Sequence, residues 1–239
     1  MALKDTMRIQ KYLSACGEMS RRAAEKAVAD GRVTVNGEPA AVGCQVTPDD
    51  VVELDGKRVG ISKKHRYILL FKPKGYVATL SDRHAEHIVT ELVDTEERVY
   101  PVGRLDRDSE GLIILTNDGE LTEKLTHPRY GKEKTYIVYC TGAGAEKAAE
   151  NIAAMRTLDG ESISPVKAKE IRRDGRSAVL ELILTEGKNR QIRRMCSALH
   201  LHVTRLVRTK IGGISAGRMK GGDWRELTAK EVEMLYADN

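Results

Sequence analysis

Asp106 stands in a charged run that separates two apolar segments of the chain. Arg104 and Arg107 lie on either side of it, glycines bracket the run, and the apolar residues 112–115 follow. This order predicts a strand, a charged turn and then a buried strand. A carboxylate beside arginines stays ionised because a nearby cation favours its charged form. Asp106 is therefore a candidate nucleophile or base, although charged turns are common and a simple ion pair with Arg107 is the alternative.

Basic residues are concentrated in one part of the chain. The whole chain carries 40 Lys and Arg against 35 Asp and Glu, a net charge of +5. Residues 186–225 alone carry ten basic residues against two acidic ones, a net charge of +8. Such a face suits a polyanion such as RNA, and a plain solvated surface is the alternative. Aromatic residues are only 4% of the chain, which argues against base-stacking platforms for single strands.

The cysteines and histidines give no pattern of metal or disulfide chemistry. The four cysteines are widely spaced, without a Cys-x-x-Cys pair, which favours reduced cytoplasmic thiols. Two histidine pairs could serve as metal ligands, but no cysteine or acidic cluster completes a site, so we expect no metal. These residues are Cys16, Cys44, Cys140 and Cys196, and the pairs His84/His87 and His200/His202.

No segment approaches the ~20 apolar residues that a membrane span needs, and the first residues lack the apolar core of a secretion signal. Hydrophobic residues make up 41% of the chain, enough for a real core. The composition therefore predicts a globular cytoplasmic protein that does not bind a membrane.

The first 62 residues predict a small α+β domain. Helical spacing covers residues 8–16, and Ser20 can cap a second helix that stops at Gly31. Short strands follow, with tight turns at Asn36-Gly37 and Asp55-Gly56. The polar, basic residues 60–65 are typical of a linker. We therefore expect two domains, 1–62 and 63–239.

The second domain predicts an α+β fold with a mainly antiparallel sheet, because strands outnumber helices and do not alternate with them. Strands are expected at 67–71, 99–105, 112–116, 135–140, 167–171, 178–184 and 203–207. Helices are expected at 120–126, 145–155 and 188–199.

Several of these segments together resemble two known families. Residues 8–13, 20–24 and 31–37 resemble the "S-four" RNA-binding domain, named after a ribosomal protein. The rest is similar to the RsuA/RluB/RluF family of ribosomal RNA pseudouridine synthases. The matching segments keep the order of the family and are 71–75, 103–106, 111–112, 116–119, 134–136 and 186–195. One of them alone would be weak evidence, whereas the ordered set is specific.

The resemblance implies a reaction that consumes no cofactor and no metal. A uridine in ribosomal RNA loses its glycosidic bond, the uracil rotates, and it is rejoined to the ribose through carbon. Asp106 would start the chemistry, either by attacking the sugar or by removing a sugar proton.

The resemblance also assigns roles to other residues. Arg193 would pair with Asp106, and loss of a buried pair of this kind costs ~3–5 kcal/mol. Tyr136 would pack on the target base and help to remove its C5 proton, and Ile192 would supply an apolar wall. Arg104 would fill the space that the flipped nucleotide leaves.

Further residues are expected to contact the RNA. Asn189, Arg190 and Gln191 are expected near the target nucleotide. The expected backbone contacts, which depend on salt because they neutralise phosphates, are Arg8, Lys11, Ser20, Arg21, Arg22, Lys26, Arg32 and Arg194.

The substrate within ribosomal RNA is less sharply indicated. Asp108-Ser109 and residues 189–191 resemble the RluB and RluF branches, which act on large-subunit RNA, although many relatives carry threonine where Ser109 stands. A small-subunit synthase and a non-catalytic RNA-binding or ribosome-assembly factor are the alternatives. A metal-dependent nuclease is a further one, and a paired-carboxylate glycosidase built on Asp108 and Glu110 has no other support. Nothing in the sequence requires more than a monomer.

Overall fold

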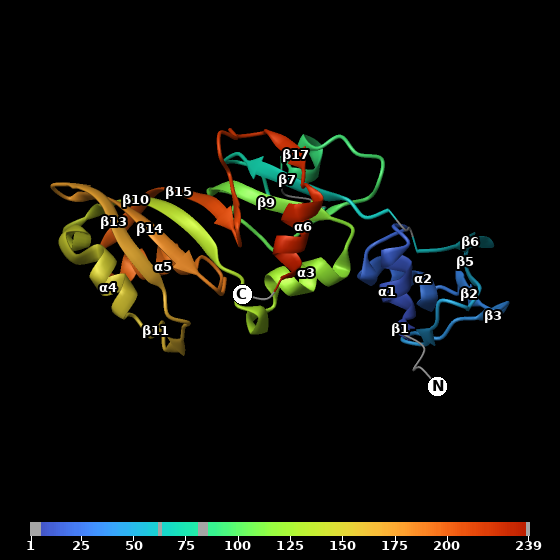
Figure 1. Ribbon diagram of the computed structural model, residues 1–239. Helices are drawn as coiled ribbons and strands as arrows, with labels where there is room; N and C mark the ends of the chain where they lie inside the picture. Colours follow the sequence, from blue (N-terminus) through green and yellow to red (C-terminus); the bar gives the residue numbers. More distant parts are fainter. Residues whose placement is uncertain (1–5, 62–63, 81–85, 238–239) are drawn as a thin grey trace. The chain divides into compact units, whose positions relative to one another are not determined.

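The computed structural model describes residues 6–61, 64–80 and 86–237, and the chain divides into two compact units. The smaller unit comprises residues 1–66 with 95–98 and 117–119, and the larger comprises 67–94, 99–116 and 120–239. The proposed boundary after residue 62 stays a prediction, because residues 62 and 63 lie outside the described part. Figure 1 shows the elements of each unit.

The smaller unit has the predicted two helices followed by short strands. Its core is made of aliphatic side chains such as Ile9, Leu13 and Val52. The Ser20 hydroxyl accepts a hydrogen bond from the Ala23 amide at 3.2 Å and so caps the second helix, as predicted. Its elements are β1 (Met7–Arg8), α1 (Ile9–Ala15), α2 (Arg21–Ala29), β2 (Val33–Val35), β3 (Glu38–Pro39), β4 (Gln45–Val46), β5 (Val52–Leu54) and β6 (Lys57–Val59).

The larger unit is built on one sheet, which has nine strands among the described residues. Seven of them follow the order β13-β14-β10-β15-β9-β7-β17, while β16 pairs with β15 and β8 pairs with β9. Every pairing in it is antiparallel except that of β15 with β9. The predicted α+β fold with a mainly antiparallel sheet is confirmed. The strands are β7 (Tyr67–Lys72), β8 (Tyr100–Pro101), β9 (Glu110–Thr116), β10 (Lys134–Gly142), β13 (Lys167–Asp174), β14 (Ser177–Leu184), β15 (Leu201–Ile211), β16 (Ile214–Ser215) and β17 (Trp224–Glu226).

Helices cover this sheet in two groups. One core lies between β10, β14 and the helices α4 and α5, and includes Ile152 and Met195. A second core joins β7 and β9 to α3 and α6, through residues such as Leu121 and Leu235. The remaining elements are η1 (Val89–Leu92), α3 (Gly119–Thr126), η2 (Pro128–Tyr130), η3 (Ala143–Lys147), α4 (Ala148–Ala154), β11 (Thr157–Leu158), β12 (Glu161–Ser162), α5 (Gln191–Ala198) and α6 (Ala229–Tyr236).

Two predicted elements near Asp106 are shorter in the structure. The strand expected at 99–105 ends at Pro101, because Gly103 adopts φ +72° and turns the chain. The helix expected from 188 begins at Gln191, because Arg190 adopts the left-handed φ of +48°. Both changes place irregular backbone where the charged residues lie. No helix in the described part of the chain is long and apolar enough to cross a membrane.

Candidate active site

The Asp106 loop, residues 103–109, connects β8 to β9. It closes as a turn in which the Ser109 amide donates to the Asp106 carbonyl at 3.0 Å. Ser109 is fully buried and leads directly into β9, whereas the Asp106 side chain stays about one third exposed, at 31%. The loop therefore has a fixed base in the core and a carboxylate that a substrate can reach.

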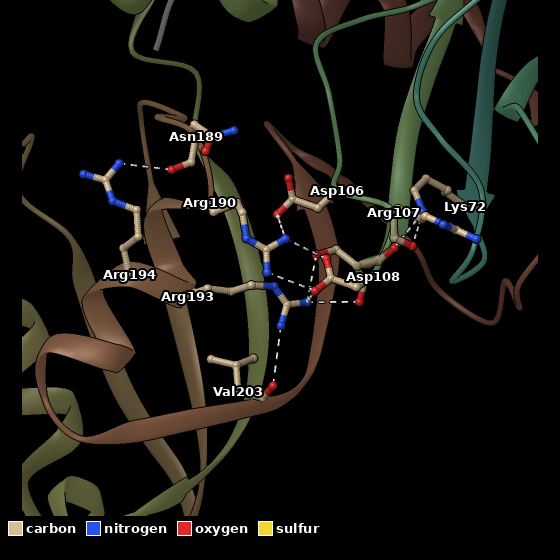
Figure 2. Close-up of polar contacts among 10 residues, drawn as sticks. Lys72, Asp106, Arg107, Asp108, Asn189, Arg190, Arg193, Arg194 and Val203 are labelled. Carbon is tan, nitrogen blue, oxygen red and sulfur yellow. Dashed lines mark hydrogen bonds and ion pairs between the residues drawn. The ribbon is translucent and has the colours of Figure 1, made fainter. Parts of the chain in front are cut away.

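Lys72 fixes the backbone of the Asp106 loop through hydrogen bonds to carbonyl groups. The sequence analysis placed this lysine only within one of the matching segments. Its side chain has no exposure to solvent, and its Nζ donates to the carbonyls of Pro73 at 2.9 Å and Ser109 at 2.8 Å. A longer contact of 3.5 Å reaches the Arg107 carbonyl, as Figure 2 shows. Burial lowers the pKa of Lys72 to about 8, against the opposing effect of the Asp108 and Asp106 charges.

A lysine at the end of a buried apolar strand is the signal by which the sequence could have revealed this role. Lysine is almost never fully buried unless its ammonium group is satisfied. Here the satisfied group fixes the backbone on both sides of Asp108.

Two arginines of the 188–195 segment converge on the Asp106 loop (Figure 2). Arg190 donates from both Nη atoms to the two carboxylate oxygens of Asp108, at 3.1 Å each. The same Arg190 lies 3.7 Å from the Asp106 carboxylate. Its left-handed backbone, immediately before α5, directs one guanidinium to both acids.

Arg193 pairs with Asp108 rather than with Asp106. Its Nη2 lies 3.0 Å from the Asp108 carbonyl, 3.3 Å from the Asp108 carboxylate and 3.2 Å from Ser109 Oγ. Within the described residues it makes no ion pair with Asp106, so the predicted Arg193–Asp106 pair is wrong in this structure. The Arg193 guanidinium, from α5, contacts Asp108 in the loop. Arg190 is the arginine that contacts Asp106.

The charge state of Asp108 reflects these partners. Burial alone would raise the pKa of the Asp108 carboxyl, but its hydrogen bonds with Arg190 and the nearby Arg193 charge lower it overall. The simpler ion pair of Asp106 with Arg107 is not formed. Arg107 instead donates to the Gly75 carbonyl at 3.3 Å and contacts Glu86 at 3.5 Å.

A cavity of about 80 Å³, which we call the Asp106 cavity, brings most of the expected residues together. Leu184 and Leu206 add apolar surface to its lining. The Tyr136 hydroxyl accepts a 3.5 Å hydrogen bond from Arg208. The expected residues that line the cavity are Arg104, Asp106, Tyr136, Arg190, Gln191, Ile192 and Arg193.

Gln191 and Arg194 are engaged within the protein. Gln191 is only 3% exposed, and its amide donates to Glu186 at 2.7 Å and accepts from the Lys188 amide at 3.0 Å. It therefore anchors the start of α5. Arg194 contacts Asp159 at 2.6 Å and the Asn189 carbonyl at 3.2 Å.

Two open grooves flank the Asp106 cavity. One of about 650 Å³ is lined by Lys74, Arg104, Asn189 and Arg190 among others. The other, of about 790 Å³, shares Lys74 and Arg190 with the first and adds Arg193, His200 and His202. Each groove therefore shares basic residues with the small cavity, and Asp108 lines both grooves as well.

The expected RNA contacts of the smaller unit differ in their availability. Arg8, Lys11, Arg21 and Arg22 are exposed and form no ion pair with the residues that the structure describes. Two other cations are paired within the unit: Lys26 contacts Asp30 at 2.6 Å, and Arg32 donates from Nε to Asp55 at 2.8 Å. Ser20 acts as the helix cap.

The histidines do not gather with other metal ligands. Within residues 6–61, 64–80 and 86–237, no three His, Cys, Asp or Glu side chains group as a metal site would require. His87 stacks on Tyr76 and contacts Glu91 at 3.7 Å. His84 lies outside the described residues.

Comparison with known proteins gives consistent matches over both parts of the chain. A family described as RNA pseudouridylate synthase matches residues 66–198, and the S4 domain matches residues 7–52. An uncharacterised RNA pseudouridine synthase of Aquifex aeolicus is 40% identical over 96% of this chain and 94% of that protein. The ribosomal large subunit pseudouridine synthase B of Bacillus subtilis is 36% identical over 96% of both chains.

Two further matches extend this picture. The dual-specificity RNA pseudouridine synthase RluF of Escherichia coli is 36% identical over 97% of this chain and 79% of that protein. A solved structure of a pseudouridylate synthase aligns over 96% of this chain and 99% of its own, with a TM-score of 0.67 and 29% identity.

Proposed function

Because this chain belongs to the RNA pseudouridylate synthase family and so is an RNA-modifying isomerase, we propose that it converts one uridine of large-subunit ribosomal RNA to pseudouridine. The Bacillus subtilis relative, matched over nearly its whole length, is named for large-subunit activity and supports this substrate. A ribosomal substrate would place the enzyme in the cytoplasm. The S4 domain and the basic grooves provide for RNA binding.

The observation that carries the proposal is the enclosure of Asp106 with Tyr136 and Ile192 in one small cavity. These residues come from three separate segments of the chain. Arg190, just before α5, and Arg193, within it, contact the loop across more than 80 residues of sequence. Asp106 is about one third exposed, so a base that entered the cavity would displace water from its carboxylate. The base must leave its stack to enter the cavity.

The reaction that we propose is an isomerisation in which atoms balance without a co-substrate. The bond between C1′ of the ribose and N1 of the uracil breaks, and a bond between C1′ and C5 forms. The C5 proton leaves, and N1 gains a proton. Asp106 initiates this sequence, by attack on the sugar or by removal of a sugar proton, and Tyr136 packs on the base and assists loss of the C5 proton.

The surrounding residues position these groups. Arg190 orients the Asp106 carboxylate, and Asp108 in turn fixes Arg190 and Arg193. Ile192 forms an apolar wall of the cavity. Arg104 lines both the cavity and the adjoining groove, where it would occupy the space that the flipped nucleotide leaves.

Mapping of pseudouridine in both ribosomal RNAs tests the proposal. RNA from cells with and without the protein is treated with carbodiimide and copied by primer extension. We expect one stop in large-subunit RNA to disappear without the protein and to return with wild type or with Asp174→Asn, an exposed control. Asp106→Asn should not restore it.

Other results have defined meanings. A lost stop in small-subunit RNA would move the substrate to that subunit. Unchanged stops in both RNAs would contradict the ribosomal assignment. Restoration by Asp106→Asn would contradict the role of Asp106.

A further inference from the structure

A second cavity, of about 140 Å³, adjoins the Asp106 cavity and shares Arg104, Tyr136 and Gly187 with it. We call it the Lys134 cavity. Its volume is well above the ~10–15 Å³ that one water molecule needs. Apolar side chains form much of its lining, including Val102, Ile114, Leu125 and Ile211.

The charge in this cavity is entirely positive. Arg104, Lys134 and Arg208 line it, and no carboxylate is among the described residues that do so. Elsewhere in the site, arginines meet acids, as Arg190 and Arg193 meet Asp108. Three cations at one cavity without an acid form a site whose charge an anion would balance.

Lys134 is the first residue of β10, between Leu184 of β14 and Ile211 of β15 in the sheet. Its amino group makes no hydrogen bond or ion pair with the residues that the structure describes. Burial and the nearby Arg208 charge lower the pKa of Lys134 to about 8. The amino group therefore lies half-buried beside another cation without an anion to offset it.

Arg208 carries an unused hydrogen-bond donor at the same place. The side chain is only 4% exposed, and its Nε donates to the Leu112 carbonyl at 2.6 Å. Its Nη1 contacts the Tyr136 hydroxyl at 3.5 Å. Its Nη2 is closed off from solvent and has no hydrogen-bond partner among the described residues. A buried donor without a partner is costly, so a shift of the Arg208 guanidinium toward a ligand that accepts from Nη2 would be favoured.

We propose that Lys134 and Arg208, with Arg104, form a subsite for one backbone phosphate of the substrate RNA, next to the target nucleotide. The inference rests on the proposed function, because the target base occupies the adjoining Asp106 cavity. Phosphates on both sides of that nucleotide are bonded to its sugar, so one of them lies close to where the base enters. Phosphate oxygens accept several hydrogen bonds, and arginine and lysine are their usual partners.

The salt dependence of RNA binding is the first test. Binding of an RNA fragment that contains the target uridine is measured in the Asp106→Asn background, so that turnover does not intervene. Lys134→Gln should weaken binding and reduce the slope of log affinity against log salt by about 1, as expected for one lost phosphate contact. Lys134→Arg should retain the slope.

Lys169→Gln is the matched control, since Lys169 is an exposed lysine on β13 of the same unit. The slope of log affinity against log salt for Lys169→Gln should equal that of the parent protein. An unchanged slope in Lys134→Gln, or an equal change in Lys169→Gln, would overturn the subsite.

Single methylphosphonate substitutions in the RNA identify the phosphate. Each phosphate near the target uridine is made neutral in turn, and binding to the parent and to Lys134→Gln is compared. We expect one methylphosphonate position that weakens RNA binding by the parent protein as much as Lys134→Gln does. The same methylphosphonate should not weaken RNA binding by Lys134→Gln any further. If every position weakens both proteins equally, the subsite does not hold an RNA phosphate.

Inorganic phosphate distinguishes a free anion from the RNA backbone. Lys134-dependent binding of inorganic phosphate without any sensitive RNA position would assign the cavity to a free anion and overturn the RNA subsite. Failure of the proposed function is seen separately, as absence of pseudouridine in the same RNA after incubation with wild-type protein. The binding slopes do not depend on that product.

Discussion

Asp108 accepts two parallel hydrogen bonds from Arg190, at 3.1 Å each, across 82 residues of sequence. Because Arg193 also binds Asp108, one carboxylate fixes both arginines of the site. Bidentate pairs of this kind add geometric precision to their energy. The arginine that reaches Asp106 is thus held by its neighbour Asp108, which itself needs no contact with the substrate.

Substitution of Asp106 should abolish product without loss of RNA binding. Asp106→Asn keeps the size of the side chain and removes the charge that initiates the reaction. We expect the single-turnover rate to fall by at least ~10²-fold, with an RNA dissociation constant close to that of wild type. Rapid product formation by this variant would place the initiating group elsewhere.

Asp108→Asn should lower the rate through misplacement of Arg190 and Arg193. We expect a fall of about tenfold or more in kcat, with a smaller change in KM. Asp94→Asn, at an exposed carboxylate, is the control and should retain both values. Equal kinetics for the two variants would show that Asp108 does not position the arginines.

The lowered pKa of Asp108 also predicts a pH dependence. Since the pKa is lower in the folded protein than the ordinary value of 3.8, the carboxylate stabilises the fold above 3.8. That contribution is lost as pH falls through the folded value. The difference in unfolding free energy between wild type and Asp108→Asn should therefore be constant above pH 3.8 and shrink as pH falls below it, and denaturant titrations between pH 2 and 6 would detect this. A difference that stays constant over the whole range would contradict it.

Lys72→Met should destabilise the Asp106 loop. The substitution leaves the Pro73 and Ser109 carbonyls without their buried donor, at a cost of ~1–3 kcal/mol each if water does not replace it. We expect lower stability in urea and a reduced kcat. Wild-type activity in this variant would show that the loop keeps its conformation without Lys72.

The pKa of Lys72 gives this prediction a second readout. Because the folded protein lowers it from 10.5 to about 8, the unfolded chain binds more protons between these values, and stability rises with pH across that window. Lys134 contributes in the same direction. Lys72→Met should show a smaller rise between pH 8 and 10.5 than wild type, and an equal rise would contradict the assignment.

Gly111→Ala should disrupt the join between β9 and β15. Gly111 has φ +112°, and a Cβ there would lie 2.2 Å from the Arg208 carbonyl oxygen. We expect a loss of about 3 kcal/mol or more in unfolding free energy. Gly175→Ala is the control, because Gly175 also has a positive φ but no atom within 4 Å of the added carbon. A similar loss in both variants would mean that backbone strain alone accounts for the effect.

The sequence predicted the fold where apolar periodicity and turn residues are local. The buried strand at 67–71, the cap at Ser20 and the antiparallel character of the larger sheet all follow from such signals, and the structure confirms them. The irregular backbone at Gly103 and Arg190 was missed. Positive φ at these residues serves contacts between distant segments, which no local pattern encodes.

In the site, too, local sequence patterns predicted some features, whereas contacts between distant segments were missed. Asp106, Tyr136 and Ile192 come from three of the ordered motifs and line one cavity, while their roles in the reaction stay predictions. The partner of Arg193 was predicted wrongly, because Asp106 and Asp108 are two residues apart and only the path of the loop decides which one meets α5. The position of Lys72 at the end of a buried strand signals its burial, but its partners are backbone carbonyls, which the sequence does not identify.

The parallel pairing of β15 with β9 spans only Val207↔Glu110 and Arg208↔Gly111. The first part of β15, with Val203 and Leu206, belongs to the core beside β10 and β14, whereas Val207 and Ile211 of β15 belong to the core of β9. The larger unit can therefore behave as two cooperative folding units, with Asp106 on one and Arg190 and Arg193 on the other. A fluctuation that parts them would separate the carboxylate from its arginines and would also remove Val207 and Ile211 from the core of β9. Inactivation on warming should then precede global unfolding, with amide exchange rising first along this short junction.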